Sequence, residues 1–276
     1  MSDHAEVTLS PLGKETTYVS QYQRDLLFAI SRKGKRDEIH VPVNLPFKGV
    51  DIWNAFELSW LNTKGKPIVS LGEFIVPCES PDIFESKSLK LYLNSFTNTR
   101  FSSKKEVADL IQKDLSDFTG ASVGVKITPI EKFSDNEIKT FEGICLDDLD
   151  VECNQYLINN EFLQTEQRIV TETVYSNLLK SNCLVTGQPD WGSVQIHYTG
   201  NKIQHEGLLK YLVSFRNHNE FHEQCVERIF MDILTICQPQ KLTVYARYTR
   251  RGGLDINPFR STEAMMPDNM ARQCRQ

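Results

Sequence analysis

The segment SNCLVTGQPDWGS, residues 181–193, sets a cysteine and an aspartate in a polar stretch. A thiol attacks only as the thiolate, so nearby donors or positive charge must lower its pKa. Asp190 follows Cys183 past a Gly-Gln-Pro turn and would fold back beside it. Because a carboxylate raises the pKa of a neighbouring thiol, Asp190 better suits a proton donor to whatever the sulfur attacks. The alternative is a buried structural cysteine, the commoner fate of an isolated thiol.

A second candidate is HNEFHEQC, residues 218–225, in which His218 and His222 stand one helical turn apart. Such a pair, with Glu220 or Glu223, could bind a metal. The order is not HExxH, and no second cluster offers a third ligand. The pattern therefore favours a His–Glu pair that binds a substrate. A polar helix start with glutamate in its first turn is the alternative.

The segment ESKSLK, residues 85–90, indicates a helix start that would bind phosphate. Ser86 and Ser88 are natural N-caps, whereas Lys87 and Lys90 oppose the helix dipole. Free amides, hydroxyls and two ammonium groups together make an anion site. A solvated helix start explains the same residues.

Near the C-terminus, Arg250 and Arg251 run into Gly252 and Gly253. Arginines at a Gly-Gly turn would clamp phosphate or carboxylate, or would simply edge the last strand. Neither GxGxxG nor GxxxxGK[ST] occurs, so a dinucleotide would not bind in a Rossmann or P-loop manner.

Composition bounds the class of protein. The 276 residues are 40% hydrophobic with a net charge of −5, which argues against a general nucleic-acid binder. No apolar run approaches the roughly 20 residues of a membrane helix, and the polar N-terminus lacks the layout of a secretory signal. Seven cysteines without a CxxC pair indicate reduced thiols in a cytoplasmic protein.

The elements that carry these residues are predicted from periodicity. Alternating residues predict strands over 39–44 and 51–61, then a hairpin turn at 61–68. Helical spacing predicts a helix over 85–98. Its apolar stripe consists of Leu89, Tyr92, Leu93 and Phe96.

The same order recurs later in the chain. Residues 190–203 predict a strand with a Gly-Asn turn, and residues 208–217 a helix with the same YLxSFxN pattern as residues 92–98. A second helix and a closing strand, 121–127 or 241–248, follow each copy. The duplication predicts an α+β fold with helices on one face of antiparallel sheets. We expect an N-terminal unit over 1–130 with a polar arm at 1–38, an acidic linker at 131–161, and a C-terminal unit over 162–276.

Together these segments resemble the NADPH-dependent 7-cyano-7-deazaguanine reductases, the nitrile reductases of queuosine biosynthesis, a pathway of tRNA modification. ESKSLKLY, Glu85–Tyr92, satisfies every position of the family signature E[SL]K[SA]hK[LY][YFW], and the segments around Cys183, Glu223 and Arg251 resemble three further family segments. The early signature and late cysteine match the family's long, two-domain form. The resemblance implies tandem tunnelling-fold units and a cytoplasmic homodimer, without direct contact to nucleic acid or membrane.

The resemblance also implies roles. Cys183 would add to the nitrile of 7-cyano-7-deazaguanine to give a thioimidate, with Asp190 and His222 as proton donors. Glu223 and Glu85 would bind the substrate base. No metal is implied. The implied NADPH contacts are Ser86, Lys87, Ser88, Lys90, Arg251 and Gly252.

Three other functions compete with the reductase. A thiol-dependent nitrile hydrolase would share Cys183 but need a Glu-Lys-Cys set and no phosphate site. A zinc cyclohydrolase on the same fold would need metal ligands. A non-catalytic purine- or pterin-binding protein would keep Glu223 and lose nothing when Cys183 is replaced.

Overall fold

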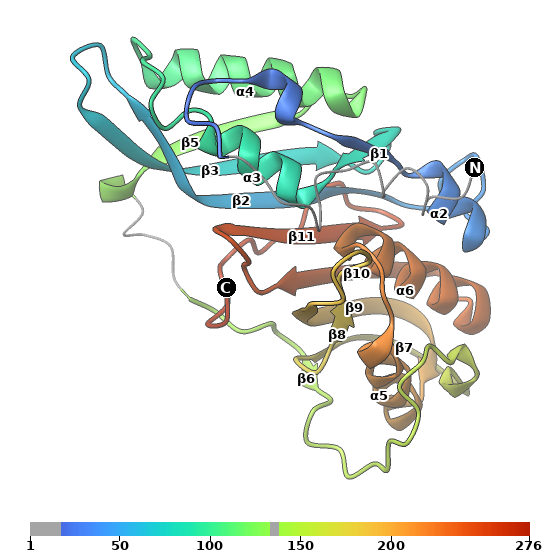
Figure 1. Cartoon of the computed structure of the whole chain (residues 1–276). Helices are drawn as coiled ribbons and strands as arrows, with labels where there is room; N and C mark the ends of the chain where they lie inside the picture. Colours follow the sequence, from blue (N-terminus) through green and yellow to red (C-terminus); the bar gives the residue numbers. More distant parts are fainter. Residues whose placement is uncertain (1–17, 133–137) are drawn as a thin grey trace. The chain divides into compact units, whose positions relative to one another are not determined.

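The computed structural model describes residues 18–132 and 138–276 (Figure 1). These residues form two compact units that interleave along the sequence. Unit 1 contains residues 18–35, 51–132 and Arg250–Asp255, and unit 2 contains Arg36–Val50, Ile138–Thr249 and Ile256–Gln276. Residues 1–17 of the predicted arm and 133–137 of the predicted linker lie outside the described residues.

Unit 1 is a sheet with helices on one face (Figure 1). Its strands are β2, Lys48–Leu61, β3, Pro67–Pro77, and β5, Gly124–Pro129, in the order β5-β3-β2, with β5 antiparallel to β3. The predicted hairpin turn between β2 and β3 is confirmed, because Asn62 N–H donates to Lys66 O at 2.9 Å and Gly65 adopts φ +82°. The helices are α3, Ser86–Asn94, and α4, Lys104–Thr119.

The described part of the N-terminal arm packs on these helices. The Tyr22 hydroxyl donates to Asp114 Oδ2 at 2.7 Å, and the Phe28 N–H donates to Ser88 Oγ at 3.0 Å. The short elements in this part of the chain are η1, Arg24–Leu26, β1, Ala29–Ser31, and α2, Lys33–Glu38. Two more short elements, β4, Asp82–Phe84, and η2, Ile130–Lys132, come later in the sequence. β1 and β4 pair antiparallel.

Unit 2 is also a sheet with helices on one face, and its sheet has more strands, in the order β11-β10-β9-β7-β6. Its strands are β6, Ile144–Cys145, β7, Thr165–Ser176, β8, Lys180–Asn182, β9, Pro189–Ile203, β10, Lys241–Tyr248, and β11, Leu254–Ser261. β10 pairs antiparallel with β11 and with β9, β9 pairs antiparallel with β7, and β6 pairs parallel with β7. β8 pairs antiparallel with the start of β9. The helices α5, His205–Ser214, and α6, His222–Cys237, lie on one face, with η3, Asn160–Phe162, and η4, Phe215–Asn217, beside α5.

The duplicated pattern YLxSFxN corresponds to a duplicated hydrogen-bond arrangement. In unit 1 the Tyr92 hydroxyl donates to Asp114 on α4 at 2.8 Å, and in unit 2 the Tyr211 hydroxyl donates to Asp232 on α6 at 2.6 Å. The serine of each copy donates to the tyrosine carbonyl at 2.6 Å. The predicted internal repeat and α+β class are therefore confirmed.

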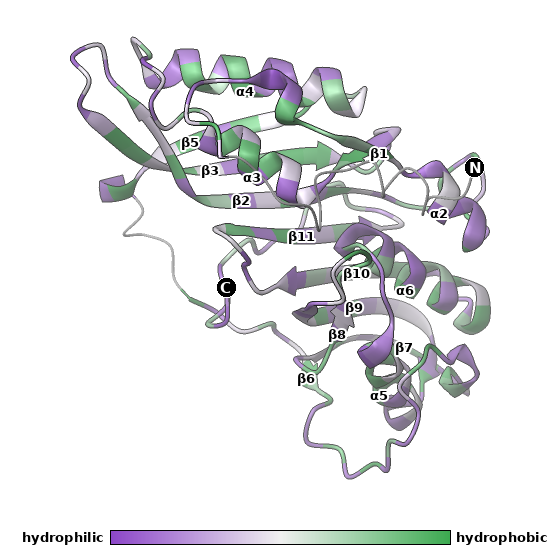
Figure 2. Cartoon of the chain, in the orientation of Figure 1, coloured by the Kyte–Doolittle hydropathy of each residue, from purple (hydrophilic) through white to green (hydrophobic). Residues whose placement is uncertain are grey.

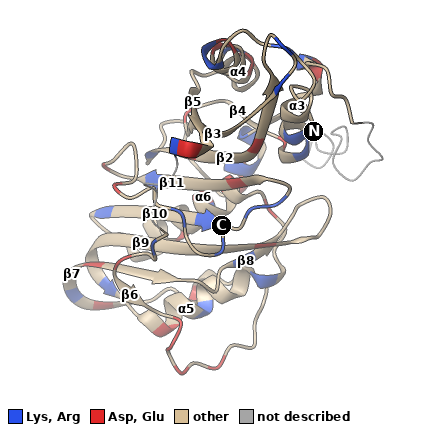
Figure 3. Ribbon diagram, turned by 90° about the vertical axis from the view of Figure 1, so that its left-hand side faces the viewer, with Lys and Arg blue, Asp and Glu red and all other residues tan. Residues whose placement is uncertain are grey.

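The core of each unit lies between sheet and helices. Tyr92, Phe96, Tyr211 and Phe215 are all 0% exposed, so the predicted apolar stripes face inward. Figure 2 shows hydrophilic and hydrophobic residues alternating along α4, α5 and α6, as helices with one solvated face require. In Figure 3 the acidic and basic residues of the described chain are interspersed.

Two local predictions are wrong. Residues 39–44 form turns and bends rather than a strand, because Pro42 has no N–H for a ladder and the side chain of Val43 is 100% exposed. The Gly-Asn turn at 200–201 does not occur, since β9 runs through it, and Gly200 leaves room for Pro239 instead. Phe141 and Leu146 of the acidic stretch are buried in unit 2, so the segment packs at these points.

Candidate active site

The hairpin of β8 and β9 carries Cys183 and Asp190. Ser181 pairs with Asp190 in the register, and Cys183 N–H donates to Gln188 O at 2.8 Å to close the turn. Gly187 turns the chain back with φ +65°, where a side chain would be strained. The Gly-Gln-Pro turn thus brings Asp190 back opposite Ser181, two residues before the cysteine.

Both side chains are sheltered from water. Cys183 is 7% exposed and Asp190 is 4% exposed. Cys225 on α6 is fully buried, and burial raises the pKa of its thiol to about 12. Cys225 is therefore protonated at neutral pH, which leaves Cys183 as the better candidate nucleophile of the two.

His222, the first residue of α6, lies next to Asp190. Its Nε2 is 3.4 Å from Asp190 Oδ2, and its ring stacks on Tyr248 of β10 with centroids 3.8 Å apart. His222 Nδ1 is buried without a hydrogen-bond partner among the described residues. The structure therefore places two of the three predicted catalytic residues, Asp190 and His222, next to each other. The third, Cys183, belongs to the same hairpin as Asp190.

Glu223 follows on α6 and is 2% exposed, between two other buried glutamates of the same segment. Glu220 accepts two hydrogen bonds from Arg228, at 3.0 and 2.9 Å. Glu227 accepts from Arg36 at 2.7 Å and from Arg260 at 2.8 Å. A buried carboxylate needs such partners or a ligand that donates hydrogen bonds.

His218 has a structural partner. Its Nε2 lies 3.0 Å from Glu220 Oε2, whereas His222 faces Asp190, so the two histidines do not converge. Within residues 18–132 and 138–276, no group of three or more His, Cys, Asp or Glu side chains could hold a metal.

Unit 1 contains the other candidate site, a cavity of about 260 Å³ beside α3. Lys87, Lys90 and Asn94 line it from one face of the helix, and Gly252 and Gly253 line it from the turn before β11. The turn needs glycine, because φ is +55° and +75°. The sequence analysis did not predict Asn94 as a site residue. Its helical spacing from Lys87 and Lys90, which places all three on one face of α3, could have indicated it. Glu57 and Tyr18 also line the cavity and carried no such signal.

The N-cap of α3 is Glu85, not Ser86 or Ser88, so that prediction is wrong. Glu85 is 0% exposed and accepts from Lys87 N–H at 2.7 Å and Ser88 N–H at 2.8 Å. Burial raises the pKa of Glu85, although these two N–H groups lower it. The amides predicted to bind phosphate are therefore taken by the chain's own carboxylate, and the substrate contact of Glu85 stays a prediction.

The remaining residues predicted to contact the cofactor differ in how accessible their side chains are to a ligand. Ser88 is 0% exposed, and its hydroxyl donates to Glu85 O at 2.7 Å, so it presents no free oxygen to a phosphate. Ser86 and Arg251 are half-buried, but neither lines the cavity. Arg250 stacks its guanidinium over Phe56 at 4.3 Å.

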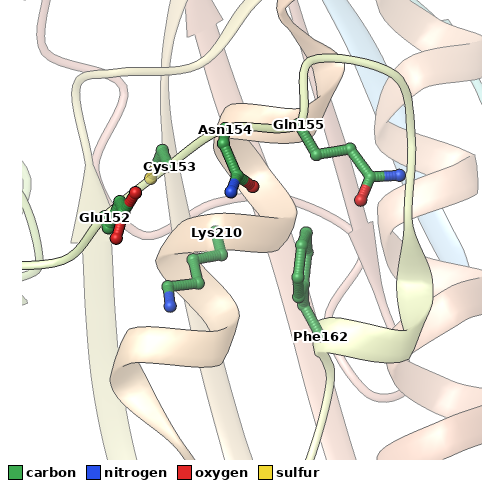
Figure 4. A pocket seen from close by; sticks show the side chains of 6 residues that line it. All are labelled: Glu152, Cys153, Asn154, Gln155, Phe162 and Lys210. Atoms are coloured by element: carbon green, nitrogen blue, oxygen red, sulfur yellow. The ribbon is translucent and has the colours of Figure 1, made fainter.

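A smaller cavity of about 140 Å³ lies in unit 2, and none of the predicted site residues lines it (Figure 4). Figure 4 shows its lining side chains, which are Glu152, Cys153, Asn154, Gln155, Phe162 and Lys210. None of the helices in the described parts of the chain is long and apolar enough to cross a membrane.

The chain is similar to known proteins over most of its length. Residues 18–127 match the family described as nitrile reductase, 7-cyano-7-deazaguanine-reductase N-term, and residues 189–266 match the family described as QueF-like protein. A curated NADPH-dependent 7-cyano-7-deazaguanine reductase of Polaromonas sp. (strain JS666 / ATCC BAA-500) is 60% identical, covering 96% of this chain and 98% of the relative. The proteins of the same name from Paraburkholderia xenovorans (strain LB400) and Delftia acidovorans (strain DSM 14801 / SPH-1) are each 57% identical, covering 96% and 97% of this chain and 98% of each relative. A solved apo archaeosine synthase QueF-Like is 16% identical, covering 36% of this chain and 98% of its own, with a TM-score of 0.31.

Proposed function

Because the chain belongs to the family of NADPH-dependent 7-cyano-7-deazaguanine reductases, we propose that it reduces the nitrile of 7-cyano-7-deazaguanine to an aminomethyl group. Two hydrides and two protons convert a nitrile to a primary amine, so two NADPH are consumed per substrate. The observation that carries the proposal is the cluster in unit 2, where the Cys183 hairpin holds Asp190 at 3.4 Å from His222.

The nitrile carbon accepts hydride poorly, and covalent capture divides the reaction into easier steps. The Cys183 sulfur adds to this carbon while the nitrogen takes a proton from Asp190, giving a thioimidate. After the first hydride reaches the carbon, the C–S bond breaks and an imine remains. His222 then protonates the nitrogen as the second hydride arrives, since an imidazole can exchange protons near neutral pH.

Recognition of the deazaguanine base falls to Glu223. A carboxylate accepts two parallel hydrogen bonds from a ring N–H and an exocyclic amine, and such charge-assisted pairs are strong in a sheltered site. Its 2% exposure keeps water from competing for those bonds. Glu85 would contribute a further contact to the substrate.

The cavity of unit 1 fits the phosphate-bearing end of NADPH. Lys87 and Lys90 supply positive charge, and the Gly252-Gly253 turn lets backbone come close to a ligand. NADPH, when bound, supplies the hydrides. Arg251 and Ser86 would join these lysines only through contacts made on binding.

Assembly and location complete the proposal. We infer a homodimer in the cytoplasm that contacts neither nucleic acid nor membrane directly. A non-catalytic base-binding protein is the second candidate, because Glu223 alone would suffice for it.

The test is NADPH oxidation with 7-cyano-7-deazaguanine, combined with intact-mass measurement of the protein mixed with substrate alone. Wild type should consume two NADPH per substrate and gain the mass of one substrate. Cys183→Ala should do neither. Cys237→Ala is the matched control, since Cys237 is 4% exposed and burial raises the pKa of its thiol to about 11. Folded wild type that binds the base without oxidising NADPH would establish the second candidate instead.

A further inference from the structure

The residue before Cys183 is hydrogen-bonded to the segment that leads into α6. Asn182 N–H donates to His218 O at 2.8 Å, and Asn182 O accepts from Glu220 N–H at 3.1 Å. The Asn182 side-chain amide also donates to Asn219 Oδ1 at 3.1 Å. Residues 218–220 are therefore a strap that lies along the end of β8, one residue from the candidate nucleophile.

The carboxylate of Glu220 fixes this strap to the helix. Glu220 is 1% exposed and accepts from Arg228 Nε at 3.0 Å and from its terminal nitrogen at 2.9 Å. His218 Nε2 lies 3.0 Å from Glu220 Oε2, the oxygen that also accepts from Arg228 Nε. Although burial raises the pKa of Glu220, the hydrogen bonds from His218 and Arg228 bring it below its usual value, so the group is ionised. A bidentate arginine pair fixes both distance and orientation.

Glu220 thus lies in the segment that connects the strand before Cys183 to the helix that begins at His222. One side of the strap holds the strand that continues into Cys183, and two residues later the chain enters α6 at His222. Arg228 lies further along α6, and its ion pair with Glu220 holds the strap against this helix. We propose that Glu220 is a positioning residue that sets the spacing between the Cys183 sulfur and the His222–Asp190 pair. The inference rests on the proposed function, because it presupposes the roles of these three side chains.

Glu227 provides a matched control on the same helix. It is 2% exposed and accepts from two arginines, Arg36 and Arg260, with distances of 2.7 to 3.0 Å. Both of these arginines lie outside the strap and outside the β8–β9 hairpin. Each glutamate accepts two hydrogen bonds from one arginine, Glu220 from Arg228 and Glu227 from Arg36. Replacing either glutamate by glutamine removes a buried charge from such a pair, so a purely structural effect should appear in both variants.

The experiment measures covalent adduct formation in full-length protein mixed with 7-cyano-7-deazaguanine and no NADPH, followed by intact mass over time. Substrate concentration is varied, so that the maximal rate of adduct formation and the substrate concentration that gives half of it (half-saturation) are obtained separately. We expect Glu220→Gln to lower the maximal rate about 10- to 100-fold, because misplacing reacting groups by about 1 Å has effects of this size. Half-saturation should change little, since Glu223 still binds the base. Glu227→Gln should form the adduct at the wild-type rate per folded molecule.

If Glu220→Gln does not fold, Glu220→Asp keeps the charge on a shorter arm, and its maximal rate should fall by a smaller factor. Equal adduct rates in folded Glu220 and Glu227 variants would overturn the positioning role while leaving the proposed function intact. A rise in half-saturation at an unchanged maximal rate would also overturn it, because Glu220 would then act on binding. Absence of adduct in wild type would remove the proposed function and this inference together.

Discussion

The imidazole of His222 lies flat on the phenol ring of Tyr248, with an interplanar angle of 1°. Tyr248 is 0% exposed at the end of β10, so it gives the imidazole a rigid support. One face of the ring is thereby closed to water, and Nε2 remains directed toward Asp190 at 3.4 Å. Tyr248 is therefore the residue that fixes the plane of the proposed proton donor, although no local pattern in the sequence singles it out.

Two replacements of Tyr248 should distinguish the effect of its stacked ring on catalysis from the effect of its hydroxyl group. Tyr248→Phe keeps the stacked ring, and we expect kcat within about twofold of wild type. Tyr248→Leu loses the flat surface, and kcat should fall about tenfold or more because His222 is no longer held in one orientation. Steady-state NADPH oxidation checks both variants. Equal losses in Phe and Leu would assign the effect to the hydroxyl beside Cys225 instead.

Glu85 should leave a signature in the pH dependence of stability. Burial raises its pKa above the usual 4.5, so the folded protein binds its proton more tightly than the unfolded chain. The free energy of unfolding contributed by Glu85 is then fully present below pH 4.5 and is lost as pH rises through the folded pKa. Glu85→Gln lacks this titration. Denaturant unfolding of both proteins across this window should show the wild-type value falling relative to the variant, whereas parallel curves would contradict the shift.

Two glycines with positive φ should respond differently to alanine. A Cβ at Gly49 would lie 2.0 Å from the Phe259 carbonyl oxygen, which is backbone and cannot move aside. A Cβ at Gly187 would meet nothing within 4 Å. Gly187→Ala should therefore cost about 1–2 kcal/mol for the backbone conformation alone. Gly49→Ala should cost clearly more, roughly 3 kcal/mol or above. Equal losses in denaturant unfolding would mean that the strand at Gly49 shifts to relieve the contact.

Local periodicity predicted much of this fold. The spacing of Leu89, Tyr92 and Phe96 identified α3, and its recurrence at 208–217 identified α5, because an apolar stripe is a property of neighbouring turns. The motif ESKSLKLY lies within the segment that matches the nitrile reductase family, so the stated resemblance is confirmed. The boundaries at 130 and 162 stay predictions, and the assignment of Arg250–Asp255 to unit 1 is a tertiary feature that no local pattern reveals.

The features of the site that could not be predicted from the sequence depend on contacts between residues far apart in the chain. The strap from Asn182 to Glu220 joins residues 38 positions apart, and the pair Arg228–Glu220 is defined only once α6 exists. The N-cap was misassigned because Ser86 and Ser88 are the commoner capping types, whereas Glu85 is selected by its buried place and its bonds to Lys87 and Ser88. In both cases burial decides which of several chemically suitable residues is used.

The phosphate proposal for unit 1 depends on the charge of α3, and Lys90 tests it. Lys90→Met keeps the aliphatic stem along the cavity and removes the ammonium group. We expect KM for NADPH to rise roughly 10- to 100-fold, because a hydrogen bond to a charged group contributes about 1.5–3 kcal/mol, while the rate of adduct formation without NADPH stays at the wild-type value. The difference from wild type should shrink as salt is added, since screening weakens the lost attraction.

Lys105→Met is the matched control for this lysine. Lys105 lies in the first turn of α4, forms a surface ion pair with Asp109, and its side chain is 81% exposed. Its loss should leave KM for NADPH unchanged, because it lines neither cavity. A similar rise in KM for both variants would indicate a general charge effect on the approach of an anionic ligand. An unchanged KM in Lys90→Met would move the phosphate contacts away from the cavity beside α3.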